Sequence, residues 1–142
     1  MQNNSQEKWT VVKPKIVRAK QLNENYTPEL CFVGENYSEK AVSIARARVK
    51  PGITTVPHHL KEVQEIYLIT KGRGKVTIAG LDPTEVNVGD VVIIPPETSQ
   101  SITNLGKNDL VFYCICTPRF TADCYVSEGR EKTVWDLCRS LK

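Results

Sequence analysis

The chain has 142 residues, of which 40% are hydrophobic and 25% are charged. This length and composition fit one globular domain with its own core, and they exclude a disordered chain. The 19 Lys and Arg residues against 16 Asp and Glu residues leave a formal charge of +3. No basic run is long enough to follow a phosphate backbone, so we expect no nucleic-acid partner.

The beginning of the chain and its cysteines bear on its location. The first residues, MQNNSQEKWT, are polar, and no apolar run approaches the roughly 20 residues that cross a bilayer. We therefore expect a cytoplasmic protein with no membrane partner. The cysteines form no CxxC pair and have no zinc-type spacing to a histidine, which favours free and mostly buried thiols. They are Cys31, Cys114, Cys116, Cys124 and Cys138.

The first third of the chain carries weak signals. Residues 1–8 are typical of a tail, and residues 9–17 alternate around Pro14 in the manner of an arm or edge strand. Residues 29–33 are a short apolar segment that fits either a strand or an exposed connection.

The run AVSIARARV, residues 41–49, alternates as a strand does. Ala45, Ala47 and Val49 share one face, and Ile44, Arg46 and Arg48 share the other. If the small residues pack outward, Arg46 and Arg48 enter the mouth of a pocket and bind a carboxylate or phosphate of the substrate. If they pack inward, both arginines are merely solvated, as most arginines are. Arg119, just after Pro118, has the same two interpretations.

A series of short strands follows, separated by Gly, Pro and Asn turns. The runs are EIYLIT (65–70), KVTIAG (75–80), PTEVNV (83–88), DVVIIPP (90–96), SQSITNL (99–105) and DLVFYCIC (109–116). The first three are predicted to be hairpin partners, and DVVIIPP, apolar on both faces, is predicted to be buried. Such a series favours a closed barrel or sandwich, because closure removes unpaired edges.

Only at the end of the chain does the spacing of apolar residues change from that of a strand to that of a helix. Val134, Leu137, Cys138 and Leu141 fall at positions i, i+3, i+4 and i+7. This spacing predicts a short amphipathic helix within residues 130–141 that packs against the barrel.

Two segments together resemble the paired motifs of the cupin superfamily. PGITTVPHHLKEVQEIYLITKG, residues 51–72, is similar to the first motif, which is PG, five residues, HxH, three or four residues, Glu, six residues and Gly. GDVVIIPPETSQSITN, residues 89–104, is similar to the second, which is Gly, five residues, PxG, two residues, His, three residues and Asn. Leu60 stands in place of the second His, Glu97 in place of a Gly, and Gln100 in place of the last His.

The resemblance implies an all-β fold, with one cupin domain over residues 1–142 that forms a double-stranded β-helix, or jelly-roll, barrel. The segment VFYCICTPRF is also similar to the last strand of small single-domain cupins of the RmlC-like type, often described as mannose-6-phosphate isomerase-like. Cupins typically hold iron, manganese, nickel or zinc through three His and one Glu inside the barrel. For this chain the implied set of ligands is reduced to His58, Glu65 and Gln100. The side-chain amide oxygen of Gln100 is a weak ligand.

Two neighbouring residues compete for places in this set. His59 reaches the interior only if a bulge turns it inward, because successive side chains of a strand point to opposite faces. Gln64 competes with Glu65, since the family uses either spacing and alternation admits one of the two. An equally open interpretation has no metal and makes His58 a hydrogen-bonded pocket residue.

Without a metal, the same groups still form a candidate acid/base site. His58 titrates near neutral pH, and a carboxyl in an apolar barrel, here that of Glu65, tends to have a raised pKa. Tyr67 shares the face of Glu65, either as a catalytic phenol or as a packing residue.

Three functions follow as hypotheses. The first is a small-molecule enzyme, isomerase-like or oxygenase-like (a dioxygenase), acting on a polar substrate in the barrel, with Gln100 among its binding residues. The second is a non-catalytic binding cupin that has lost its metal. The third is an interaction module acting as a homodimer, with exchange of the arm at residues 9–17.

Overall fold

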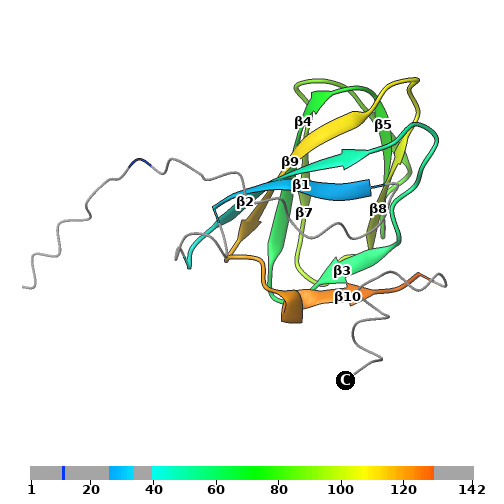
Figure 1. Cartoon of the computed structure of the whole chain (residues 1–142). Coiled ribbons are helices and arrows are strands. Elements are labelled where there is room, and N and C mark those ends of the chain that lie inside the picture. The colour runs from blue at the N-terminus through cyan, green and yellow to red at the C-terminus, as the bar shows by residue number, and fades with distance from the viewer. Residues whose placement is uncertain (1–10, 12–25, 34–39, 130–142) are drawn as a thin grey trace, which may run out of the picture.

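The computed structural model describes residues 11, 26–33 and 40–129, which form two antiparallel five-stranded sheets packed face to face (Figure 1). The first sheet has the order β1 (Tyr26–Val33), β2 (Ser43–Val49), β9 (Leu110–Thr117), β4 (Gln64–Lys71) and β7 (Val91–Ile94). The second has the order β10 (Tyr125–Ser127), β3 (His58–Leu60), β8 (Gln100–Asn104), β5 (Gly74–Ile78) and β6 (Thr84–Val86). The predicted all-β jelly-roll architecture is confirmed.

Most strands lie where the alternating runs predicted them, and the exceptions are short. The three-residue strands β3 and β10 and the 3-10 turn η1 (Ala122–Cys124) were not predicted. Of the predicted hairpin partners, β5 and β6 pair with each other, whereas β4 pairs with β7 and β9. The predicted tail at residues 1–8 lies outside the described residues. The predicted arm at 9–17, of which only residue 11 is described, and the predicted helix at 130–141 lie outside them too.

Apolar side chains from both sheets fill the space between them. Alternation sends every second residue of a strand inward, so Leu110 and Phe112 on β9 are buried while Val111 between them faces outward. The main core cluster consists of Val49, Tyr67, Ile69, Val76, Ile78, Val86, Val92, Ile94, Ile102, Leu110 and Phe112. A smaller cluster at one end consists of Leu60, Val63, Cys116 and Cys124.

The prediction that residues 90–96 are buried on both faces is wrong. Val92 and Ile94 are buried, but Val91 and Ile93 are 56% and 60% exposed. Within the described residues, β7 is an edge strand of the first sheet and pairs only with β4, and its alternate side chains point to the outer face. Its outward residues therefore lie at a border of the outer face.

Two residues that match the cupin motifs have structural tasks. Gly72 has a φ of +88°, and a Cβ there would lie 2.9 Å from the carbonyl oxygen of Asp109, so only glycine fits. Asn104 is buried and its amide donates to the carbonyls of Val49 and Asn108 at 2.9 and 2.8 Å, while its oxygen accepts from the N–H of Gly106 at 2.8 Å. It thereby fixes the turn between β8 and β9.

No helix in the described part of the chain is long and apolar enough to cross a membrane.

Candidate functional site

Among the buried polar side chains of the described residues, three lie close to one another between the two sheets. Glu65 and Tyr67, two residues apart on β4, point inward from the first sheet and are 7% and 6% exposed. Gln100 begins β8 in the second sheet, where it is 2% exposed and pairs with His58 on β3. The fold thus brings Glu65, Tyr67 and Gln100 from both sheets into the interior, with His58 next to Gln100 in the β3–β8 ladder.

A hydrogen bond across the sheets orients the amide of Gln100. The Tyr67 phenol donates to Gln100 Oε1 at 2.5 Å. Burial, reinforced by the nearby carboxylate of Glu65, raises the pKa of Tyr67 well above its usual value, so the phenol stays protonated and acts as a donor. With Oε1 engaged, Gln100 Nε2 is left buried without a hydrogen-bond partner among the described residues.

Glu65 is paired on one of its two carboxylate oxygens. Cys116 Sγ lies 3.4 Å from Oε2 of Glu65, close enough for a thiol hydrogen bond, while Oε1 is buried without a partner in the described part of the chain. Burial, and then the charge of Glu65, raise the pKa of Cys116, and the same two causes raise that of Cys114. These thiols therefore stay protonated near neutral pH, which disfavours a nucleophilic role. Cys114, Cys116 and Cys124 are free cysteines.

His58 lies at the border of this region and is half-buried. Its Nδ1 lies 2.9 Å from the carbonyl oxygen of Val56, to which it donates, and its ring stacks on Tyr125 with a centroid distance of 4.9 Å. In the neutral imidazole a proton on Nδ1 leaves a lone pair on Nε2. His58 is therefore held in one tautomer, with Nε2 able to accept a proton.

The two residues that compete for places in the set point elsewhere. His59 lies on the opposite face of β3 from His58, and its Nδ1 is 3.1 Å from Glu128 Oε1. Gln64 is only half-buried and is followed by the buried Glu65, so alternation brings Glu65 to the interior.

The described residues do not form a ready metal site. No group of three or more His, Cys, Asp or Glu side chains with metal-binding geometry exists among them. Leu60, at the place of a family ligand, packs with Val63, Cys116 and Cys124, and the oxygen of Gln100 is engaged by Tyr67. One imidazole, one carboxylate and an occupied amide fit a bound metal poorly, so we assign it no chemical step.

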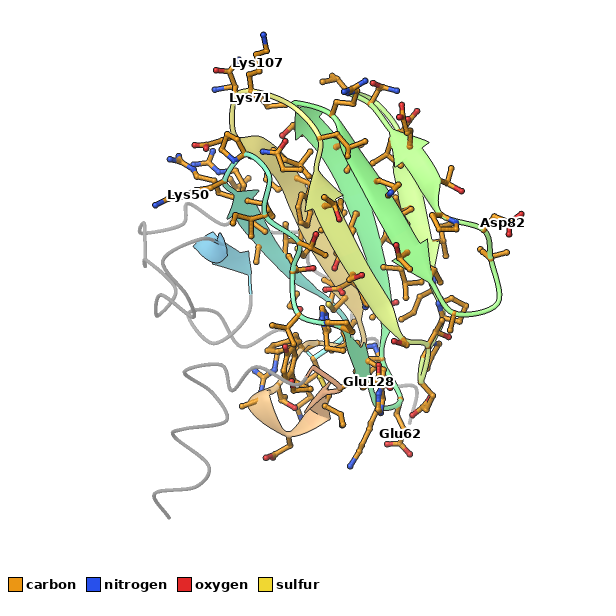
Figure 2. The ribbon with its side chains drawn as sticks, turned by 90° about the vertical axis from the view of Figure 1, so that its right-hand side faces the viewer. Lys50, Glu62, Lys71, Asp82, Lys107 and Glu128 are labelled. Carbon is orange, nitrogen blue, oxygen red and sulfur yellow. The ribbon has the colours of Figure 1, made fainter. Side chains whose placement is uncertain are left out.

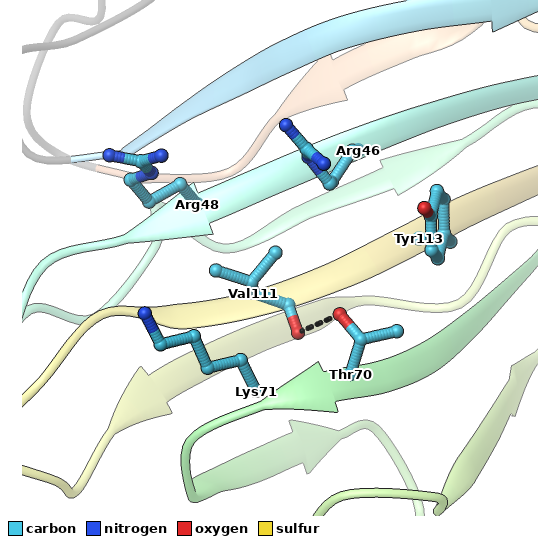
Figure 3. Close-up of a pocket in the computed structure, with 6 residues that line it drawn as sticks. All are labelled: Arg46, Arg48, Thr70, Lys71, Val111 and Tyr113. Carbon is cyan, nitrogen blue, oxygen red and sulfur yellow. Dashed lines mark hydrogen bonds between the residues drawn. The ribbon is translucent and has the colours of Figure 1, made fainter.

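The arginines face away from this region. Ala47 and Val49 pack on the core, which places Arg46 and Arg48 on the outer face of the first sheet. There they line a separate surface pocket (Figure 3). Arg119 lies in the segment after β9, where its backbone N–H donates to the carbonyl of Lys40 at 3.2 Å. The structure does not join Arg46 and Arg48 to Glu65 and Gln100.

The fold and motifs agree with comparisons to known proteins. A family model described as "Cupin domain" matches residues 45–116, just over half of the chain. The chain belongs to the cupin family. The uncharacterized protein MJ1618 of Methanocaldococcus jannaschii is 37% identical to this cupin over 79 residues, which are 56% of the chain and 62% of the relative. The cupin thus spans less than two thirds of that relative's length.

Two solved structures place the cupin among its structural neighbours. A conserved protein with a double-stranded β-helix domain from Klebsiella pneumoniae has a TM-score of 0.64 at 13% identity, over 80% of this chain and 92% of that one. Oxalate oxidase in complex with the substrate analogue glycolate has a TM-score of 0.52 at 26% identity, over 55% of this chain and 42% of that one. The first likeness shows the fold alone.

Proposed function

We propose that this cupin acts on a small polar molecule that carries a hydroxyl next to a carbonyl or carboxylate, bound between Glu65 and Gln100. The observation that carries the proposal is that Glu65 Oε1 and Gln100 Nε2 are two of the three buried polar atoms left without partners among the described residues, the third being Ser127 Oγ. Burying such groups unpaired is costly. A ligand hydroxyl that donates to Glu65, beside an oxygen that accepts from Gln100, satisfies both.

These residues suit an isomerase-like proton transfer. Glu65 takes the proton from the carbon that bears the hydroxyl, and the C–H electrons pass into an enediolate. The proton then returns to the adjacent carbon, while the hydroxyl proton passes to the former carbonyl oxygen, so that the carbonyl and the hydroxyl exchange places. Gln100 Nε2 stabilises the negative charge that develops on the carbonyl oxygen. Tyr67 positions Gln100 through its hydrogen bond. We favour this class over an oxygenase-like reaction because proton transfer needs a base and a hydrogen-bond donor, and Glu65 and Gln100 supply them.

One structural neighbour supports the ligand class. Glycolate, the analogue bound by the oxalate oxidase neighbour, carries a hydroxyl next to a carboxylate. A hexose phosphate of the mannose-6-phosphate type carries the same pair as a hydroxyl next to an aldehyde. In both molecules the hydroxyl can donate to Glu65 while the neighbouring oxygen accepts from Gln100.

Glycolate is the simplest probe of this site. We expect it to shift the amide NMR signals of residues 65–67 and 100, and acetate, which lacks the hydroxyl, to shift them less. Glu65→Gln and Gln100→Leu should each weaken binding about tenfold or more, since each removes a hydrogen bond to a charged or buried group. Glu85→Gln, on the exposed face of β6, is the matched control. Equal binding by all four proteins would refute the proposed site.

A non-catalytic binding cupin is the second candidate, favoured by the apolar packing of Leu60 at a ligand position. Exchange in D₂O separates the two. Proton transfer incorporates deuterium at C2 of mannose 6-phosphate or at C1 of fructose 6-phosphate, and Glu65→Gln should abolish that incorporation. Binding of these sugars without any incorporation would identify a binding module.

A further inference from the structure

A hollow lies on the outer face of the first sheet (Figure 3). Tyr67 and Phe112 pack on the opposite side of the same sheet. The hollow has a volume of about 330 Å³, which lies within the range of small-molecule pockets, roughly 300–1,000 Å³. Residues from three adjacent strands line it: Arg46, Arg48, Thr70, Lys71, Val111 and Tyr113.

A β-bulge in β4 helps to build this pocket. Ile69 pairs with Phe112 and Lys71 with Val111, so Thr70 is an extra residue in the ladder. Without the bulge, Lys71 would share the inward face of Ile69; with it, Lys71 turns outward beside Val111. The Thr70 hydroxyl donates to the carbonyl of Val111 at 3.1 Å and holds this arrangement. The irregularity thus adds a third cation to the two arginines.

The pocket keeps its basic character although its arginines have other interactions. Arg48 Nη1 lies 3.4 Å from Asp109 Oδ2, and both side chains are partly exposed. Arg46 and Arg48 make further interactions as well. A guanidinium has five N–H donors, so one ion pair does not exhaust its capacity to bind an anion.

Charges elsewhere reinforce this end of the molecule. Lys50 and Lys107 project from the same end of the molecule as the pocket residue Lys71 (Figure 2). These lysines add positive charge near the pocket, which the carboxylate of Asp109, the partner of Arg48, offsets in part.

We propose that this pocket binds a small organic anion with a phosphate or carboxylate group. Lys71 and the arginines would hold the acidic group, and the organic part would rest on Val111 and the Tyr113 ring. Arg46 lies opposite Tyr113 and Arg48 opposite Val111 in the β2–β9 ladder, so cations flank the apolar floor. The site is separate from Glu65 and Gln100, because Val111 and Tyr113 face outward on β9 while Phe112 faces inward.

The test is an NMR titration of the full chain with phenyl phosphate and with benzoate, which separates phosphate from carboxylate recognition, and with benzyl alcohol as the neutral analogue. We expect at least one acid to shift the amide signals of residues 70, 71 and 111, with benzyl alcohol far weaker and added salt weakening the binding. Lys71→Ala and Arg46→Gln should each weaken it about fivefold or more. Lys61→Ala, an exposed lysine on the β3–β4 turn, should change it less than about twofold.

Several outcomes would overturn the proposal. The first is that neither acid shifts these signals, and the second is that both acids shift only residues 65–67 and 100. The third is that Lys71→Ala and Arg46→Gln, both correctly folded by circular dichroism, bind as Lys61→Ala does. Should Lys71→Ala fail to fold, Arg46→Gln against Lys61→Ala decides alone.

Discussion

Tyr67 and Gln100 are joined across the two sheets by a hydrogen bond of 2.5 Å from the phenol to the amide oxygen. Gln100 stands where related cupins have a histidine, and in this chain it belongs to a buried polar pair instead. The bond also determines which end of the amide is left for a ligand. Its removal should therefore affect both stability and binding.

Tyr67→Phe should lower the free energy of unfolding by about 1–3 kcal/mol, because Gln100 Oε1 then stays buried without its donor. Gln100→Leu removes the other partner, and the double variant should cost clearly less than the sum of the two single changes. Urea denaturation of the four proteins measures this coupling. Additive effects would mean that the hydrogen bond contributes nothing to stability.

Stability should fall as the pH rises above about 8.5, where thiols ionise in an unfolded chain. Burial and the charge of Glu65 raise the pKa of Cys116 in the folded state, so between the unfolded and folded pKa values the folded chain holds more protons. Unfolding then releases protons and becomes easier by up to about 1.4 kcal/mol per pH unit for each such group. Tyr67 adds the same effect above about pH 10.

Unfolding curves at pH 8, 9 and 10 test this dependence. Cys116→Ala should flatten the decline, whereas Thr77→Ala, an exposed change on β5, should leave its slope unaltered. A decline as steep in Cys116→Ala as in the unchanged protein would show that this thiol does not titrate as argued.

Glu97 occupies a place where the cupin motif has glycine, and the backbone shows why. Its φ is +59°, in the left-handed region, while its carboxylate accepts from the N–H of Glu62 at 2.7 Å. Glu97→Ala loses this hydrogen bond and keeps the strain, whereas Glu97→Gly loses the bond and relieves the strain. We expect the glycine variant to be more stable than the alanine variant by about 1 kcal/mol in thermal or urea unfolding. At Glu85, on strand β6, we expect the alanine variant to be the more stable one, because glycine weakens a regular strand. A more stable glycine variant at both positions would contradict the argument.

The sequence predicted what depends on local alternation. The period-two runs predicted which residues of β2, β4 and β9 share a face. They left open which face of β2 points inward and whether Glu65 or Gln64 lies inside, and the structure answers both. What depends on pairing between distant segments was missed. The contact of Cys116 with Glu65 arises from β4–β9 register, and the outward turn of Lys71 from a bulge in that ladder. Neither leaves a signal in a single strand.

The edge position of β7 also bears on assembly, for which we predict a homodimer. Ile44, Ile115, Ile66 and Ile93 face one another in successive registers and form a row across the outer face of the first sheet. The row ends at an edge strand with exposed apolar side chains, a combination that favours pairing with a second copy. A stable dimer buries about 800 Å² per partner. We place this interface at the β7 edge, because the same face also carries the pocket lined by Arg46 and Lys71.

Light scattering at micromolar concentration measures the mass. Ile93→Lys should shift the protein toward monomer, and Val88→Lys, equally exposed but outside the row, should not. A monomer before any substitution would rule out the dimer.

Leu60 and Gln100 are the two places where the chain departs from a full set of metal ligands. Both positions lie where a histidine side chain would complete that set. Leu60 shares the inward face of β3 with His58, and Gln100 pairs with His58 across the ladder. Leu60→His with Gln100→His should therefore place three imidazoles and the Glu65 carboxylate together and raise affinity for Ni(II) or Co(II) by at least about a hundredfold. The unchanged protein should bind more weakly, and His58→Ala weaker still, since it removes the imidazole at the site. Calorimetric titration with the metal alone orders the three proteins, with circular dichroism to check folding. Equal affinity in the rebuilt and unchanged proteins, both folded, would mean that these side chains do not converge and that the site is wrongly assigned.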